Sequence, residues 1–141
     1  MTRDKGWRQR LARAAVFWII STTMLRGNRS KSLKRVKRAL DEAGVGAKIR
    51  EMPASTRTVI RAANAIGCHI DQMAKSIIFR AEATGAAILF ITAGANQVSA
   101  DLASVLTAEP LGKADSDLIR HQTGFAIGGV APIGHLMPIR A

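Results

Sequence analysis

The sequence contains little cysteine and few aromatic residues. Its 141 residues include one cysteine, Cys68, no tyrosine, and only 4% aromatic residues. A single cysteine excludes an internal disulfide and any zinc site built from several cysteines, and it is typical of a reducing, cytoplasmic compartment. Because 48% of the residues are hydrophobic, the chain can still bury one core, formed mainly by Ala, Ile, Leu and Val.

The sequence also lacks the motifs of several large enzyme classes. It has no phosphate-binding loop, dinucleotide fingerprint, H-E-x-x-H helix or Gly-x-Ser-x-Gly turn. The three histidines, His69, His121 and His135, are isolated, which favours surface or structural roles over metal binding. We therefore expect no metal and no cofactor. An enzyme of this composition would have to act through backbone groups, a lysine and a positioned water.

No hydrophobic run is long enough for stable membrane insertion. The apolar segment Ala14–Leu25 has about a dozen residues, whereas a spanning helix needs about 20. We expect residues 1–31 to form a poorly ordered basic and apolar extension. Three interpretations stay open for it: a segment upstream of a natural start at Met24, a signal-like or membrane-surface segment, or an arm that contacts RNA.

Acidic residues are scarce at the N-terminal end of the chain. Twelve of the 21 Lys and Arg residues but only one of the ten acids lie in residues 1–40, so the net charge of +11 belongs to that region. A helix is predicted from Ser32, as N-cap, to Ala43. Its outer face is predicted to carry Lys34, Arg35, Lys37 and Arg38. Such a face is either simply solvated or binds RNA phosphates.

The remaining pattern predicts an α+β domain over residues 32–141, with a mixed, curved sheet or partial barrel flanked by helices. Further helices are expected at Thr58–Ile66 and Ser99–Leu106, and a last helix through His121 is expected to be capped by Asp115 or Ser116. Strands are expected at Ala47–Met52, Lys75–Ala81 and Ala86–Thr92, with a loop at Pro110–Ala114. The last predicted feature is a strand and loop rich in glycine and proline, over residues 123–135.

Two segments carry the functional hypothesis. Lys75 precedes a buried strand, where it is either a lysine that reaches solvent or a cation fixed at the mouth of a pocket. The segment Gly128–Pro132 (GGVAP) is either a tight bend or a set of aimed backbone groups that hold a substrate and orient water.

Four motifs in series point to a known family. They are HIDQMAKSIIF, ITAGANQV, LGKAD and TGFAIGGVAPIGH, all within residues 69–135. On these motifs the chain resembles the YbaK/EbsC family, the free-standing relatives of the editing domain of bacterial prolyl-tRNA synthetase. The resemblance implies a deacylase that hydrolyses the aminoacyl ester of mischarged tRNA, usually tRNA for proline. A prolyl-tRNA synthetase is a further candidate partner.

The resemblance also implies roles for individual residues. Lys75 would orient the substrate and offset negative charge at the tRNA end or the scissile carbonyl. Gly128, Gly129, Val130, Ala131 and Pro132 would position the aminoacyl group and the attacking water, with Gly128 and Lys75 as the catalytic pair. A further residue, Thr58, either lines the pocket or only caps its helix.

Two departures from the family pattern keep a second hypothesis open. Family members do not usually carry the extension over residues 1–23, and they normally continue beyond the glycine-proline loop. The chain is therefore expected to lack the usual C-terminal part of the domain. The alternative to an active deacylase is a catalytically inactive remnant that still binds tRNA or an aminoacyl group.

Overall fold

The protein is described here by a computed structural model that covers residues 26–47, 49 and 58–141, with side chains from residue 31 onward. The predicted strand at Ala47–Met52 and the apolar segment Ala14–Leu25 fall largely or wholly outside these residues. The elements in chain order are α2 (Arg26–Glu42), α3 (Val59–Ile66), the 3₁₀ helix η1 (Ile70–Gln72), β1 (Ala74–Ala81), β2 (Ala87–Ala93), α4 (Ala100–Thr107), β3 (Leu111–Lys113) and α5 (Ser116–Thr123).

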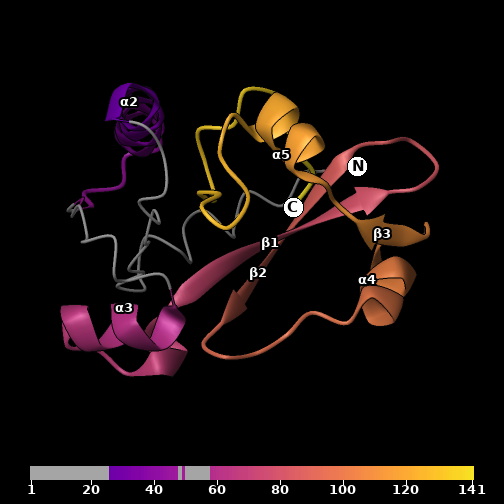
Figure 1. The fold of residues 1–141 in the computed structure, drawn as a ribbon, viewed down its shortest axis with the longest axis horizontal. Helices are drawn as coiled ribbons and strands as arrows, with labels where there is room; N and C mark the ends of the chain where they lie inside the picture. Colours follow the sequence, from indigo (N-terminus) through magenta and orange to yellow (C-terminus); the bar gives the residue numbers. More distant parts are fainter. Residues whose placement is uncertain (1–25, 48, 50–57) are drawn as a thin grey trace.

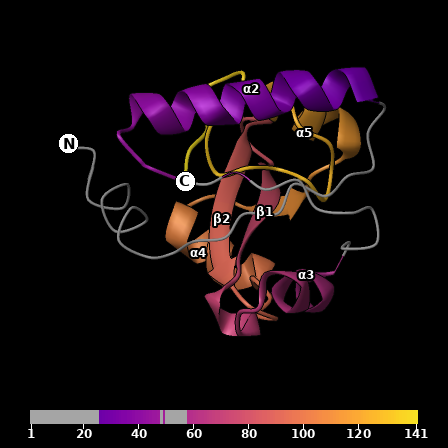
Figure 2. The same ribbon diagram turned by 90° about the vertical axis from the view of Figure 1, so that its left-hand side faces the viewer.

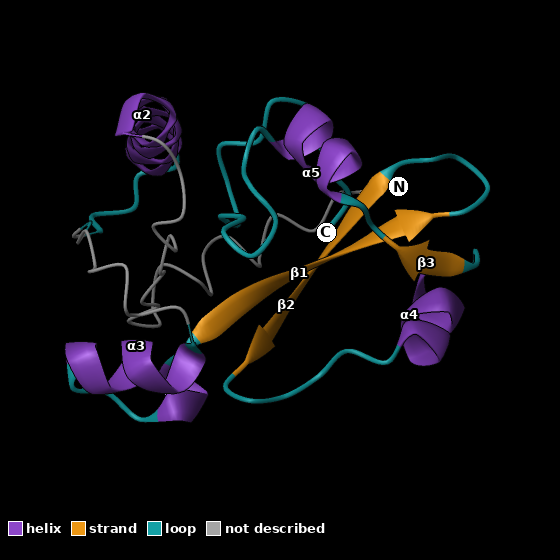
Figure 3. Cartoon of the chain, viewed as in Figure 1, coloured by secondary structure: helices purple, strands orange, loops and turns teal. Residues whose placement is uncertain are grey.

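The sheet of the described residues has three strands in the order β2-β1-β3, and all its pairings are antiparallel. One isolated parallel bridge, between Ile88 and Arg140, is added along β2. The α+β class is therefore confirmed, in the form of a small open sheet with helices around it (Figures 1 and 3). The α4 helix packs against β3, α5 against β2, and α3 against η1.

Helix ends that carry local capping signals lie close to where the sequence predicts them. Thr58 accepts a hydrogen bond from the backbone N–H of Arg61 at 3.2 Å, and Gly67 ends α3 in the left-handed conformation. Ser99 and Asp115 cap α4 and α5 in the same way. The predicted caps at Thr58, Ser99 and Asp115 are confirmed.

Three predicted elements are wrong in detail. Ser32 is not an N-cap, since α2 begins at Arg26 and Ser32 is buried within the helix. The helix starts earlier because the upstream arginines and Lys31 are good helix formers. The predicted loop at Pro110–Ala114 contains β3, whose Leu111 is buried against β1 and β2. No strand forms between residues 124 and 139, where left-handed glycines interrupt any extended run.

Buried apolar side chains of the described residues form three clusters. One lies between the sheet and α4, around Ala81, Ile88 and Ala103, with the rings of Phe79 and Phe90 in an edge-to-face contact at 5.7 Å. A second joins α3 to Met73. The third joins α2 to the glycine-rich segment through Val36, Leu40, Phe125, Val130 and Ala131.

Arg35 fastens α2 to the rest of the molecule. The prediction that it belongs to the outer face of the helix is wrong. Its Nε donates to the carbonyl of Gly134 at 3.1 Å, and its Nη2 donates to the carbonyl of Gly124 at 2.8 Å. The guanidinium also lies 5.0 Å from the centroid of the Phe125 ring. A charged side chain with two carbonyl acceptors and an aromatic face gains more by packing inward than by being solvated. Figure 2 shows the resulting position of α2, which lies across one end of the strands beside α5.

We predict that Arg35→Met lowers the free energy of unfolding by about 2–3 kcal/mol, because two charge-assisted hydrogen bonds and a ring contact are lost. Urea denaturation measures the change. The neighbouring substitution Lys34→Met, on the exposed side of α2, is the matched control and should stay within about 0.5 kcal/mol of the parent. Equal effects of the two substitutions would contradict the structural role given to Arg35.

Candidate functional site

Lys75 is the second residue of β1, where it pairs with Thr92 of β2 and is half-buried. Side chains alternate along a strand, so Lys75 shares its face of the sheet with Ile77 and Phe79. Within the described part of the chain, its ammonium group has no hydrogen bond and no ion pair. The lysine is thus a free cation at the end of an apolar strand face, which is where the sequence predicts it.

The neighbouring Ser76 has a buried hydroxyl oxygen with no hydrogen-bond partner among the described residues. An enclosed hydroxyl that makes no hydrogen bond costs about 1–3 kcal/mol. Nothing in the residues around Ser76 marks it as a site residue before the strand is placed in the fold. Because side chains alternate along β1, this hydroxyl lies on the face of the sheet opposite Lys75.

The segment Gly128–Pro132 begins with a tight turn. The N–H of Gly129 donates to the carbonyl of Ala126 at 3.0 Å, and Gly128, the third residue of this turn, has φ +79°. A turn of this kind with positive φ at its third position favours glycine. A Cβ added at Gly128 would meet nothing within 4 Å, so the backbone angle, and not crowding, calls for glycine here.

The backbone of this turn presents unused donors. Counting only described residues, the N–H groups of Gly128, Val130 and Ala131 donate to no backbone or side-chain acceptor. Gly128 is exposed, whereas Ala131 and Pro132 at the other end of the segment are buried. The segment therefore has a buried end and an exposed tip, and the unused N–H groups run from Gly128 at the tip to Ala131 at the buried end, an arrangement suited to binding a carbonyl or an anion.

His135 fixes the base of this segment. Its Nε2 lies 2.7 Å from the carbonyl oxygen of Ala131, and because a carbonyl can only accept, we assign the proton to Nε2. The ring makes an edge-to-face contact with buried Phe125 at 6.0 Å. Burial lowers the pKa of His135; its hydrogen bond to Ala131 opposes this effect, and the charge of Arg35 adds to the lowering. The net effect favours the neutral form of the imidazole.

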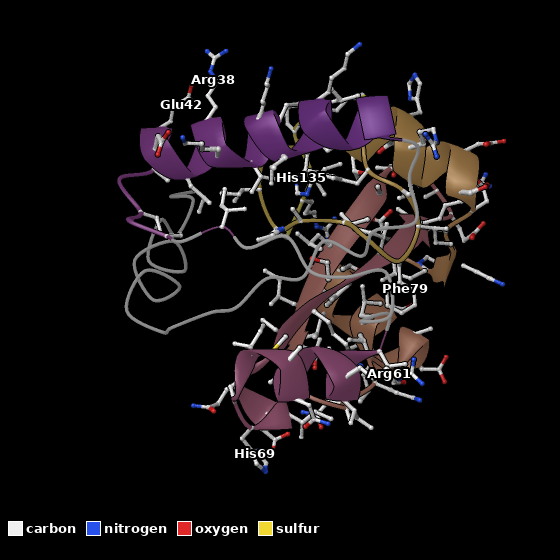
Figure 4. All side chains as sticks on the ribbon, turned by 60° about the vertical axis from the view of Figure 1, so that its left-hand side comes forward. Arg38, Glu42, Arg61, His69, Phe79 and His135 are labelled. Atoms are coloured by element: carbon white, nitrogen blue, oxygen red, sulfur yellow. The ribbon has the colours of Figure 1, made fainter. Side chains whose placement is uncertain are left out.

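Gly134 brings the segment directly against α2. It has φ +76°, and a Cβ placed there would lie only 3.2–3.3 Å from the backbone of Arg35 and Val36. Glycine is thus required twice at this position, by the left-handed backbone and by the close approach of the helix. Figure 4 shows His135 on the inner side of α2, between the helix and the strands.

The residues predicted from the sequence lie on three separate parts of the fold. Lys75 is on β1, Gly128–Pro132 lies in the segment after α5, and Thr58 is the N-cap of α3. No hydrogen bond between described residues joins any two of these parts. The structure adds Arg35 and His135, whose packing and hydrogen bonds hold the base of the glycine-rich segment and which the sequence did not mark as site residues. The two hydrogen bonds of Arg35 join residues that are 89 and 99 positions apart in the sequence. No local sequence pattern could therefore predict them.

Neither a metal site nor a membrane-spanning helix is present in the described ranges. No group of three or more His, Cys, Asp or Glu side chains there could hold a metal ion. In those same ranges, no helix combines the length and the apolar character needed to cross a membrane.

The sequence profile of the aminoacyl-tRNA editing domain matches residues 53–140, more than half of the chain. The chain belongs to the aminoacyl-tRNA editing domain family. The matched region includes Lys75 and the whole glycine-rich segment, and the predicted resemblance to YbaK-type editing domains is confirmed. No curated protein sequence matches the chain.

Solved structures agree with this assignment. A protein described as a candidate trans-editing enzyme for prolyl-tRNA synthetase is 44% identical, with a TM-score of 0.70 over 77% of this editing domain chain and 68% of its own. A structure from a study of epitope grafting onto scaffold proteins is 39% identical, with the same TM-score, over 77% and 69% of the two chains. A hypothetical protein at 24% identity, with a TM-score of 0.63 over 72% and 67%, shares the fold.

We predict that Gly134→Ala destabilises the editing domain more than Gly128→Ala. Both substitutions force a left-handed alanine, at a cost of about 1 kcal/mol or more. Only Gly134→Ala also pushes a methyl group against the backbone of α2. Thermal and urea denaturation of both variants test the order, and an equal loss would show that α2 does not press on the segment.

We also predict that His135 makes the stability of the domain depend on pH. Its pKa is lower in the folded protein than in the unfolded chain, where it is about 6.5. The stabilisation is therefore complete above about pH 6.5 and is lost as the pH falls from there through the lowered pKa.

His135→Gln keeps a side-chain N–H donor but does not titrate, so its free energy of unfolding should fall less than that of the parent between pH 7.5 and 5.5. His121→Gln, at an exposed histidine on α5, is the control and should follow the parent curve. Parallel curves for all three proteins would contradict the lowered pKa.

Proposed function

We propose that this member of the editing domain family hydrolyses the ester that joins a wrong amino acid to tRNA, with tRNA for proline as the substrate. The observation that carries the proposal is the open turn at Gly128, whose N–H donors are unused among the described residues. Arg35 and His135 hold the segment in place by hydrogen bonds to its carbonyl groups. The 44% identity to a candidate trans-editing enzyme for prolyl-tRNA synthetase supports tRNA for proline as the carrier.

The reaction needs no side-chain nucleophile. Water adds its oxygen to the ester carbonyl carbon, the bond to the ribose oxygen breaks, and that oxygen takes up the proton, which leaves a free amino acid and the tRNA hydroxyl. An aminoacyl ester is already activated, so orientation and stabilisation of the developing oxyanion can supply much of the rate enhancement. The N–H groups at Gly128, Val130 and Ala131 are the donors that we assign to this task.

Lys75 supplies the positive charge in this proposal. Lys75 is half-buried and has no partner for its ammonium group among the described residues, so it can offset the negative charge of the terminal phosphate or of the oxyanion. Pro132 fixes the backbone at the buried end of the segment, and Gly129 closes the turn. We further propose that the open end of the α3 cap at Thr58 borders the aminoacyl group, and that the protein acts in the cytoplasm, where charged tRNA is used.

The test is hydrolysis of a panel of tRNA(Pro) esters of alanine, cysteine, serine, threonine and proline. We expect the parent to release one or more of the amino acids other than proline. Lys75→Met, which keeps the aliphatic part of the side chain, should lower kcat/KM by about 100-fold or more. Lys113→Met, at an exposed lysine of the same sheet, is the matched control and should hydrolyse the ester at the parent rate.

Two results would overturn parts of the proposal. If the folded parent binds tRNA but leaves every ester intact, the protein is a binding member of the family without turnover. If Lys75→Met is as active as the parent while both are equally stable, the charge at Lys75 has no part in the reaction.

A further inference from the structure

The outer face of α2 carries a row of exposed cations. Lys31, Lys34, Lys37 and Arg38 are all exposed, and no acidic residue precedes Asp41 on the described helix. Figure 4 shows Arg38 and Glu42 on the outer side of α2, whereas His135 lies on the inner side. Residues three and four positions apart are neighbours on a helix surface, so these four cations form one continuous stripe, here called the α2 basic stripe.

Most of the charge in the α2 basic stripe is not neutralised by the protein. Arg38 pairs with Glu42 at 2.7 Å, with both side chains highly exposed. Lys31, Lys34 and Lys37 have no hydrogen bond or ion pair with any part of the chain that the structure describes. Like charges at this spacing oppose helix formation slightly, by about 0.2–0.5 kcal/mol per pair. An anionic partner would remove that cost.

The inner face of the same helix is joined to the open turn. Arg35 donates to the carbonyls of Gly124 and Gly134, and Val36 packs against Phe125 and Ala131. A helix with its side chains is about 10–12 Å thick. Three or four stacked nucleotides, at about the 3.4 Å rise of one strand in a duplex, span that thickness. A strand held by phosphates on the α2 basic stripe could therefore reach around the helix to the segment Gly128–Pro132.

We propose that the α2 basic stripe binds the sugar-phosphate backbone near the 3′ end of tRNA and directs that end to the open turn. This inference rests on the proposed function and adds the surface that holds the RNA. Residues 41–141 contain nine cations and nine acids and so have no net charge. The positive charge that favours binding of a polyanion is concentrated in residues 1–40, which include most of α2. Phosphate contacts of this kind give affinity without sequence preference and weaken as salt rises.

The experiment compares three sets of substitutions. The triple change Lys31→Gln, Lys34→Gln and Lys37→Gln removes three charges from the α2 basic stripe. The matched control, Arg80→Gln, Lys113→Gln and Arg120→Gln, removes three exposed charges from the sheet and α5. In Figure 1, β3 with Lys113 lies on the far side of the molecule from α2. The triple change of the same three lysines to arginine keeps the charge. Thermal denaturation establishes that all variants fold.

Two substrates separate binding of the RNA from chemistry at the ester. On full aminoacyl-tRNA, the Gln variant of the stripe should lose at least about tenfold in kcat/KM through a higher KM. Its slope of log affinity for uncharged tRNA against log salt should fall by up to about three. On 3′-O-aminoacyl-adenosine, which carries the ester without the preceding phosphates, the same variant should match the parent. The control and arginine variants should match the parent on both substrates.

The outcomes distinguish failure of this inference from failure of the proposed function. Binding of uncharged tRNA is measured by fluorescence anisotropy and does not depend on ester hydrolysis. If the stripe and control variants lose tRNA affinity equally, or neither loses any, the α2 basic stripe is not the binding surface. If the stripe variant keeps tRNA affinity but loses binding to vesicles of anionic lipid, the stripe is a membrane contact and the inference is wrong.

Discussion

The clamp between Arg35 and two backbone carbonyls is the interaction on which the candidate site depends. The segment after α5 has no strand or helix of its own between residues 124 and 139, so regular backbone pairing does not fix its shape. Arg35 supplies part of that shape from α2, and His135 supplies another part by holding Ala131. Because Arg35 and His135 hold the base of the segment through its carbonyl groups, the exposed N–H of Gly128 at the tip can stay unused without disordering the segment.

In the proposed function, this arrangement would allow the domain to act on an ester with few catalytic side chains. The hydrogen-bond donors assigned to the reaction are backbone groups, so the site depends on the path of the chain more than on the side chains along it. Gly128 and Gly134 permit left-handed turns, and Pro132 restricts the backbone between them. Lys75, on a paired strand, is the one cationic side chain that the proposal requires at the centre of the chemistry.

Local signals in the sequence predicted much of the fold. The caps at Thr58, Ser99 and Asp115, and the two long strands around Lys75 and Phe90, follow from residues near each other in the chain. The features that could not be predicted from the sequence depend on contacts between residues far apart in the chain. The three residues of β3 are too few to show the alternation of apolar and polar residues that is typical of a strand. Nothing in the sequence around Arg35 distinguishes it from Lys34 or Lys37, because its partners Gly124 and Gly134 are far away in the chain. The relative position of Lys75 and the turn is likewise a property of the whole fold.

The division of the interior into three small clusters has a consequence for how the molecule moves. The cluster between α2 and the glycine-rich segment shares no residue with the one between the sheet and α4. Separate clusters permit subglobal opening, in which one unit detaches while the others stay folded. Amide hydrogens of α2 would then exchange with solvent at a lower free energy than those of β1 and β2. The protein could release the base of its turn, and so interrupt its site, without unfolding its sheet.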